Sequence, residues 1–301
     1  MTILKNLRYN LKLGHRKLRE TPFYKVVELV QPYVLFSLSK YTAGQKEIFK
    51  DVKTFCLFIG HGRSGHSVIG SLLDAHPHII LPDELDSLKY LEIGATKHQL
   101  YHLTLMRSQK QARHGRTKSG RNGKRYSYAV PNQWQGQFRK IEIIGDSKVG
   151  VSTRRLSNNP ALLQKLRETV EVDIKFLQVV RNPYDNISTK AVRERKPLSH
   201  AIQTYFSDCQ DLVKIYSFLD PNDLLIIRHE DLIEDAAAFL LKLSGFLGFE
   251  PFPDYIRDCA GIIYPSPAKS RYTIEWPAQL IEQVSQQIEK YDFLAGYSYE
   301  N

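Results

Sequence analysis

Cysteine is scarce in this chain, with three residues in 301, at positions 56, 209 and 259. No two of them have the spacing of a metal or redox pair, and Cys56 lies inside an apolar run, which argues against a disulfide framework and against a zinc site. The composition therefore favours a reducing compartment. We expect a cytoplasmic protein with no metal ion in its site.

Long apolar runs are also missing. The best candidate, residues 27–38, is short and interrupted by a glutamate, a glutamine and a proline, so we expect no transmembrane segment. Residues 1–20 are basic and carry leucines that predict an amphipathic helix, packed on the fold, on a partner or peripherally on an anionic membrane. We divide the chain into a basic helical N-terminal extension, residues 1–50, and one α/β domain, residues 51–301.

Acidic residues are outnumbered, because 42 lysines and arginines stand against 32 aspartates and glutamates and give a formal charge of +10. Much of the excess lies between Arg107 and Arg125, where no acid occurs. Glycines at 115, 120 and 123 predict a loop there, with disorder, a mobile lid or contact with an acidic substrate as its open roles. Nucleic-acid binding is disfavoured because this segment lacks interleaved aromatic residues.

Apolar runs alternate with helical patterns along the rest of the chain. The runs end at Ile59, Leu81, Ile144, Val180 and Ile227. The helical patterns begin near Ser67, Asn159, Asn186, Glu234 and Pro277. This alternation predicts an α/β fold with a central parallel β-sheet flanked by helices, of the P-loop nucleotide-binding type, and ligands of such sheets bind beyond the carboxyl ends of the strands.

A glycine-rich turn follows the first predicted strand. Gly60, Gly62 and Gly65 allow successive N–H groups to converge on one anion, and the helix that follows adds the positive end of its dipole. The nucleotide-binding P-loop pattern fits except at one position, where His66 replaces the phosphate-binding lysine. This disfavours a kinase, which needs that lysine and a metal ion. A sulfuryl group carries less charge, and Arg63 supplies a cation for it.

A second anion site is predicted where the strand 174–180 ends at Arg181. Pro183 is well placed to open the next helix, and the hydroxyls of Ser188 and Thr189 lie about two turns beyond the arginine. A guanidinium and a hydroxyl in this arrangement can bind one phosphate together.

These motifs resemble the sulfotransferase family that uses 3′-phosphoadenosine 5′-phosphosulfate (PAPS), over roughly residues 53–298. Residues 63–67, Arg-Ser-Gly-His-Ser, resemble its 5′-phosphosulfate loop. Residues 181–183, Arg-Asn-Pro, with a hydroxyl eight residues after the arginine, resemble its 3′-phosphate segment. Residues 228–232 and 269–276 resemble two later segments, the second of which closes over the cofactor in many members.

The resemblance implies a sulfotransferase-like fold, PAPS as the donor and 3′,5′-adenosine bisphosphate (PAP) as a product. It places the cofactor against Gly62, Arg63, Ser64, Gly65, His66, Ser67, Arg181, Ser188, Thr189, Lys269, Ser270 and Arg271. Two residues depart from the family motif, since His66 replaces a threonine and His229 replaces a tyrosine. An imidazole can still hydrogen-bond a phosphate or sulfate oxygen.

Sulfuryl transfer needs a base for the acceptor hydroxyl and cations for the leaving group. Glu84 lies where the resembling protein-tyrosine sulfotransferases have their catalytic glutamate, and its local competitors are Asp83 and Asp86. Lys148 follows a predicted strand where family members carry a lysine that faces the leaving group. Arg63 is the second catalytic cation. The nearby histidines 76 and 78 are better explained by turn packing.

We therefore predict a PAPS-dependent sulfotransferase that moves a sulfuryl group to an acceptor hydroxyl by in-line displacement. A P-loop kinase and a non-catalytic PAP-binding protein are the alternatives. Carbohydrate, tyrosine in a peptide, lipid and small molecule stay open as acceptor classes, and no nucleic acid is expected as a partner.

Overall fold

The structure is a computed structural model that describes residues 46–119 and 125–301. The predicted amphipathic helix 1–20 and nearly all of the extension 1–50 lie outside these residues, so the division of the chain stays a prediction. Among the helices of the described residues, none is both long enough and apolar enough to cross a bilayer.

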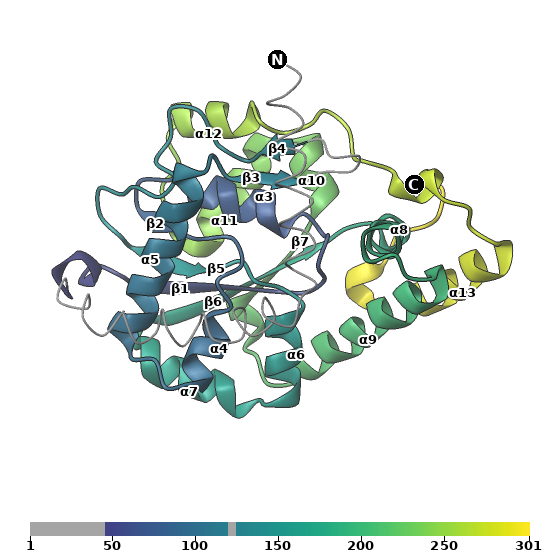
Figure 1. Cartoon of the computed structure of the whole chain (residues 1–301), viewed down its shortest axis with the longest axis horizontal. Coiled ribbons are helices and arrows are strands. Elements are labelled where there is room, and N and C mark those ends of the chain that lie inside the picture. Colours follow the sequence, from purple (N-terminus) through teal and green to yellow (C-terminus); the bar gives the residue numbers. More distant parts are fainter. Residues whose placement is uncertain (1–45, 120–124) are drawn as a thin grey trace, which may run out of the picture. The chain divides into compact units, whose positions relative to one another are not determined.

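The core of the fold is a five-stranded parallel sheet in the order β2-β5-β1-β6-β7 (Figure 1). The strands are β1 (Thr54–Ile59), β2 (Ile79–Ile80), β5 (Ile143–Asp146), β6 (Asp173–Val180) and β7 (Leu224–Arg228). They end within two residues of the positions that the apolar runs predict, and the α/β fold class is confirmed.

Helices connect the strands and cover both faces of the sheet. They are α3 (His66–Leu73), α4 (Ser87–Glu92), α5 (Lys97–Arg113), α6 (Val151–Asn158), α7 (Ala161–Val170), α8 (Pro183–Glu194), α9 (Leu198–Tyr216), α10 (His229–Glu234), α11 (Ala236–Leu247), α12 (Pro253–Ala260) and α13 (Ala278–Ile288). Single 3₁₀ turns are η1 (Lys46–Phe49), η3 (Pro221–Asp223), η4 (Ser270–Thr273) and η5 (Asp292–Leu294). A separate two-stranded hairpin consists of β3 (Thr117–Ser119) and β4 (Arg125–Ser127).

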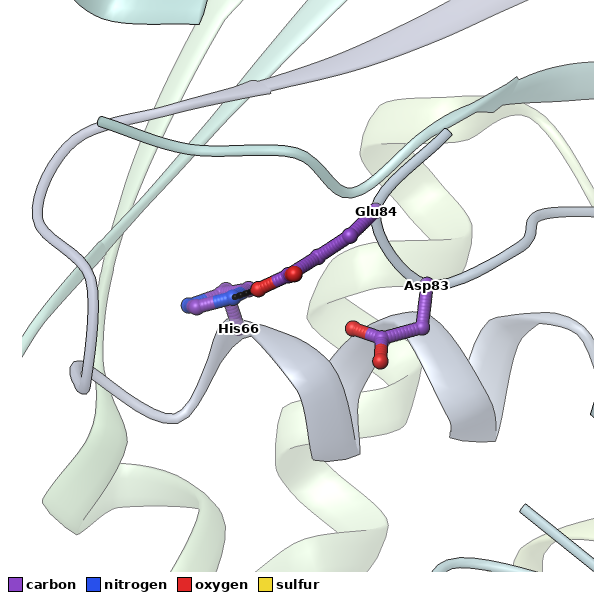
Figure 2. Close-up of side chains that lie close together, drawn as sticks. All are labelled: His66, Asp83 and Glu84. Carbon is purple, nitrogen blue, oxygen red and sulfur yellow. Dashed lines mark ion pairs between the residues drawn. The ribbon is translucent and has the colours of Figure 1, made fainter. Parts of the chain in front are cut away.

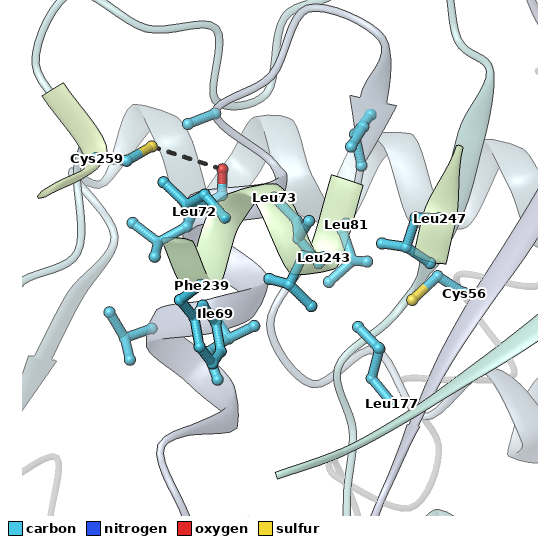
Figure 3. Close-up of a cluster of buried hydrophobic side chains, with 14 of the residues drawn as sticks. Cys56, Ile69, Leu72, Leu73, Leu81, Leu177, Phe239, Leu243, Leu247 and Cys259 are labelled. Carbon is cyan, nitrogen blue, oxygen red and sulfur yellow. Dashed lines mark hydrogen bonds between the residues drawn. The ribbon is translucent and has the colours of Figure 1, made fainter. Parts of the chain in front are cut away.

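The central strand β1 alternates its side chains between the two faces. Cys56 and Phe58 join a cluster with α3 and α11 on one face, part of which Figure 3 shows, whereas Phe55 stacks on Tyr101 of α5 on the other. Burying one such large apolar side chain is worth roughly 1.5–3 kcal/mol. Gly145 of β5 lies so close to β1 that an added Cβ would overlap the Cys56 carbonyl oxygen. This packing fixes the carboxyl ends of β1 and β5, where the site lies.

A second apolar cluster joins α8, α9 and the C-terminal segment. Tyr184, Tyr205 and Trp276 are its large buried members. Asn182 caps α8 by accepting a hydrogen bond from the Tyr184 N–H at 3.0 Å, and Pro183 occupies the first turn, where no N–H is needed. The cluster therefore holds α8 and the residues after 268 side by side.

The prediction of a loop between Arg107 and Arg125 is wrong for its first part. Helix α5 continues to Arg113, because no glycine occurs before residue 115 and the helix has a complete capping box at its start. The chain then enters β3, and residues 120–124 lie outside the described part. Arg116, far from being a mobile surface cation, is 6% exposed and forms an ion pair with the fully buried Asp74.

Candidate functional site

The turn between β1 and α3 has the backbone geometry of an anion cradle. Gly60, Arg63 and Gly65 have φ angles of 116°, 71° and 100°. Within the described residues, the backbone N–H groups of residues 62–65 donate to no protein acceptor. The first turn of α3 adds its own N–H groups and the positive end of its dipole. Converging free donors of this kind suit a phosphate or sulfate.

Arg181 links this cradle to the second predicted anion site. One guanidinium nitrogen donates to the carbonyl oxygen of Arg63 at 3.4 Å, and another donates to the carbonyl oxygen of Ala268. A third contact, 3.9 Å long, is with the carboxylate of Asp185. The two motifs, which are 118 residues apart in the chain, are therefore in direct contact, as one nucleotide spanning them would require.

The C-terminal segment packs against α8 beside Arg181. Thr189 donates a hydrogen bond to the hydroxyl of Ser270 at 3.1 Å, and Lys269 is exposed. Arg271 is 1% exposed and forms a 2.8 Å ion pair with Asp185. Its guanidinium is thus oriented by a buried carboxylate.

Ser188 differs from its neighbour Thr189. It is fully buried, and its hydroxyl accepts a hydrogen bond from the Trp276 indole at 2.9 Å. We therefore leave Ser188 out of the proposed phosphate site.

The loop after β2 carries Glu84 to the carboxyl end of β5. Glu84 has a φ of 57°, so the backbone there is left-handed. Asp146, fully buried at the end of β5, accepts hydrogen bonds from the backbone N–H groups of Leu85, Ser87 and Lys148, at 2.9, 2.7 and 3.1 Å. One carboxylate thus fixes both the loop that carries Glu84 and the start of the segment that carries Lys148.

The carboxylate of Glu84 lies between His66 and Lys148. Figure 2 shows it extended toward the imidazole, with His66 Nε2 at 3.8 Å from Oε1. Lys148 Nζ lies 3.3 Å from Oε2. His66 first, and then Lys148, hold the pKa of Glu84 at about 2, although burial acts to raise it. Glu84 is therefore ionised at neutral pH.

The competitors of Glu84 have other partners. Asp86 forms an ion pair with Arg155 at 3.3 Å, and His76, 2% exposed, contacts the carbonyl oxygen of Glu250 at 3.0 Å. His78 pairs with Glu142 at 3.1 Å.

Asp83 is the one competitor that stays close to the site. It offers, with His66 and Glu84, ligand atoms that all lie within 4.8 Å of one another, which is close enough to hold a metal ion. Of the two Glu84 oxygens, Oε1 faces His66 and Oε2 contacts the ammonium of Lys148 at 3.3 Å.

Two cavities are relevant here, and the first one adjoins this centre. One, of about 270 Å³, has Glu84 in its wall together with Ser67, Ser71, Arg107, Lys110 and Tyr128. The other, of about 330 Å³, lies at the 3′ segment and is lined by Asn182, Arg228, Lys269 and Arg271. Glu84 thus faces a space large enough for a small group, on a different side from the C-terminal basic segment.

The model of the sulfotransferase family matches residues 57–254, which contain the cradle, Glu84, Lys148 and Arg181. The chain belongs to the sulfotransferase family. The resemblance stated from the motifs and the expected enzyme class are thereby confirmed. No curated protein matches the chain.

Several solved sulfotransferases share the fold. The sulfotransferase domain of the Synechococcus PCC 7002 olefin synthase has a TM-score of 0.53 and 18% identity, covering 80% of this chain and 95% of that domain. The sulfotransferase domain from the curacin biosynthetic pathway has a TM-score of 0.52 and 17% identity, covering 81% and 99%. Sulfotransferase STF9 from Mycobacterium avium has a TM-score of 0.50 and 11% identity, covering 90% and 86%. At these identities the likeness shows the fold alone.

The two histidines that depart from the sulfotransferase motif both contact the cradle. His66 opens α3 and reaches Glu84. His229 packs against Gly65, where an added Cβ would lie 2.8 Å from its Cε1 atom and nearer still to Nδ1. Burial, and then Arg181, lower the pKa of His229 to about 4, so this imidazole is neutral at neutral pH.

Sequence reasoning named His229 only as a departure and did not find Asp146 as the anchor of the Glu84 loop. The position of Asp146, a carboxylate at the end of an apolar strand, was the available signal.

Proposed function

We propose that this sulfotransferase uses PAPS as its donor and transfers the sulfuryl group to an acceptor hydroxyl by in-line displacement. The observation that carries the proposal is the contact between Arg181 and the Arg63 carbonyl, because it joins a set of free N–H donors to a guanidinium in one continuous anion site. The cradle would hold the 5′-phosphosulfate. Arg181 and Thr189, with Lys269, Ser270 and Arg271 beside them, would hold the 3′-phosphate.

The reaction forms a bond between the acceptor oxygen and sulfur and breaks the bond from sulfur to the 5′-phosphate oxygen, which leaves as PAP. Glu84 takes the proton of the acceptor hydroxyl, since it is ionised at neutral pH and lines the cavity. Arg63 and Lys148 stabilise the charge that develops on the leaving phosphate oxygen.

After His66, Lys148 contributes to the low basicity of Glu84. In the free protein its ammonium helps to keep the pKa of Glu84 at about 2, which makes the carboxylate a weak base. A phosphate that draws Lys148 away removes this contact and raises the pKa of Glu84, so the carboxylate becomes a stronger base when the donor is in place.

The test is transfer of labelled sulfate from PAPS to a mixed panel of hydroxyl compounds. Wild-type protein is expected to form labelled products without added metal, and Glu84→Gln is expected to lower the rate by about 100-fold or more while PAP still binds. Glu142→Gln is the matched control. Lys140 and Lys53 likewise lower the pKa of Glu142 to about 2, but Glu142 does not line the cavity.

Two results would overturn the proposal. Phosphoryl transfer from ATP that requires magnesium would indicate a kinase. Tight PAP binding with no transfer to any acceptor, and no effect of Glu84→Gln on any measured property, would indicate a PAP-binding protein. A cytoplasmic location stays a prediction that rests on the three free, buried cysteines.

A further inference from the structure

Helix α5 forms a basic wall of the cavity beside Glu84. Arg107 and Lys110 are three residues apart, so they share one face of the helix, and both line the cavity with His114, which follows the last helical residue. The helix contains no aspartate or glutamate. The C-terminal part of α5 therefore presents its cations to the cavity.

Two of these cations have no acidic partner among residues 46–119 and 125–301. In the part of the chain that the structure describes, no carboxylate lies within 4.0 Å of Arg107 or Lys110. Arg107 donates a long hydrogen bond, 3.5 Å, to the backbone carbonyl of Glu84. Arg116, which also lines the cavity, is paired with Asp74, and Glu84 is paired with Lys148. The charge of Arg107 and Lys110 is therefore available to a ligand.

The acidic groups of the cavity lie on the loop after β2, whose backbone contacts α5 through Arg107 and Gln111. Ligand atoms of Asp83, Glu84 and His66 lie within 4.8 Å of one another, and Glu84 is turned toward the imidazole (Figure 2). The cavity thus has a proton-accepting group in one part and uncompensated positive charge along α5. A molecule that meets both would place a hydroxyl at Glu84 and an anionic group at the helix.

We propose that the cavity takes an acceptor that carries a negative group, such as a carboxylate, sulfate or phosphate, close to the hydroxyl that receives the sulfuryl group. This inference rests on the proposed function and narrows its acceptor. A guanidinium and an ammonium on adjacent turns favour such a group, since charge-assisted hydrogen bonds are stronger than neutral ones. Neutral acceptors of the same shape lack this interaction.

The test uses pairs of acceptors that differ only in charge. One pair is 4-hydroxyphenylacetate and its amide, and the other is methyl glucuronide and its amide, so the pairs also separate a phenol from a sugar. For at least one pair we expect kcat/KM to be about tenfold higher for the charged member, mostly through KM. The preference should shrink as salt is raised.

Variants assign this preference to α5. The double variant Arg107→Gln with Lys110→Gln is expected to reduce the preference to about threefold or less, whereas Arg107→Lys retains most of it. Arg113→Gln is the control, because it removes one positive charge from the same helix, but Arg113 lines a different cavity. It is expected to leave the preference unchanged.

Three results would overturn the inference. Equal kcat/KM within both pairs would do so, and so would a preference that the double variant leaves intact. A double variant that weakens PAP binding instead would assign these cations to the donor.

If no compound of either pair is sulfated, binding of the same compounds is measured by calorimetry with PAP present. This tests the inference about charge without depending on sulfuryl transfer. Binding of a charged member that the double variant weakens supports the inference. Equal or absent binding within both pairs refutes it.

Discussion

Replacing Gly65 by alanine tests the cradle most sharply. Gly65 has a φ of 100°, and an alanine in a left-handed conformation costs roughly 1–2 kcal/mol. The new Cβ would also lie 2.8 Å from His229 Cε1, so the imidazole must move. If moving the imidazole costs about 1 kcal/mol, the substitution destabilises the cradle conformation by about 2–3 kcal/mol in total. Expressed in the affinity for PAP, this is about a 30- to 140-fold increase in Kd.

The assay is calorimetric titration with PAP, with thermal unfolding of the free protein as a check on the fold. Gly62→Ala is the control for folding, because it is the same substitution three residues earlier and its Cβ would meet nothing within 4 Å. The double variant Gly65→Ala with His229→Ala separates the two costs. It should recover the steric part of the lost affinity but not the backbone part.

The reasoning about the cradle would be refuted if Gly65→Ala bound PAP as tightly as the wild-type protein. Full recovery in the double variant would show that only the contact with His229 matters and that the left-handed backbone does not.

Three further predictions concern stability. The pKa of Glu84 is lowered from 4.5 to about 2, so the stability that its carboxylate contributes is fully present above about pH 4.5 and is lost as the pH falls toward 2. Its side chain is 42% exposed, so this contribution is small. Urea unfolding should show that Glu84→Gln lowers the free energy of unfolding by only about 1 kcal/mol at pH 7 and by nothing near pH 2. Arg116→Ala leaves the buried Asp74 without its cation and should lower the free energy of unfolding by about 3 kcal/mol or more, whereas Arg113→Ala should change it by less than about 0.5 kcal/mol. Gly145→Ala forces a Cβ into the neighbouring strand and should abolish soluble folded protein, as judged by circular dichroism; a normal spectrum would contradict the close packing of β1 and β5.

The sheet was predictable because its strands are continuous apolar runs with polar residues at their ends. A strand buried on both faces is mostly apolar, so the ends at Ile59 and Val180 were visible in the sequence alone. The cradle was predictable for a related reason. Its glycines, hydroxyls and arginine are adjacent in the chain, and their role depends mostly on local backbone geometry.

What the sequence did not give depends on contacts between distant segments. The glycines of the segment 107–125 suggested a loop, but the first of them comes after α5 has ended, and the apolar pattern that buries this helix begins before residue 107. The pairing of His66 with Glu84 likewise requires the left-handed backbone at Glu84 and the anchoring of its loop by Asp146. No pattern in either segment predicts that contact.

The central claim is that the cradle and Arg181 bind the two phosphates of one nucleotide, and comparison of PAP with adenosine 5′-monophosphate and adenosine 3′-monophosphate tests it most directly. The account predicts that PAP binds at least about tenfold more tightly than either monophosphate, and that Arg181→Ala removes most of its advantage over the 5′-monophosphate. Equal affinity for PAP and one of the monophosphates, or no binding of PAP at all, would contradict it.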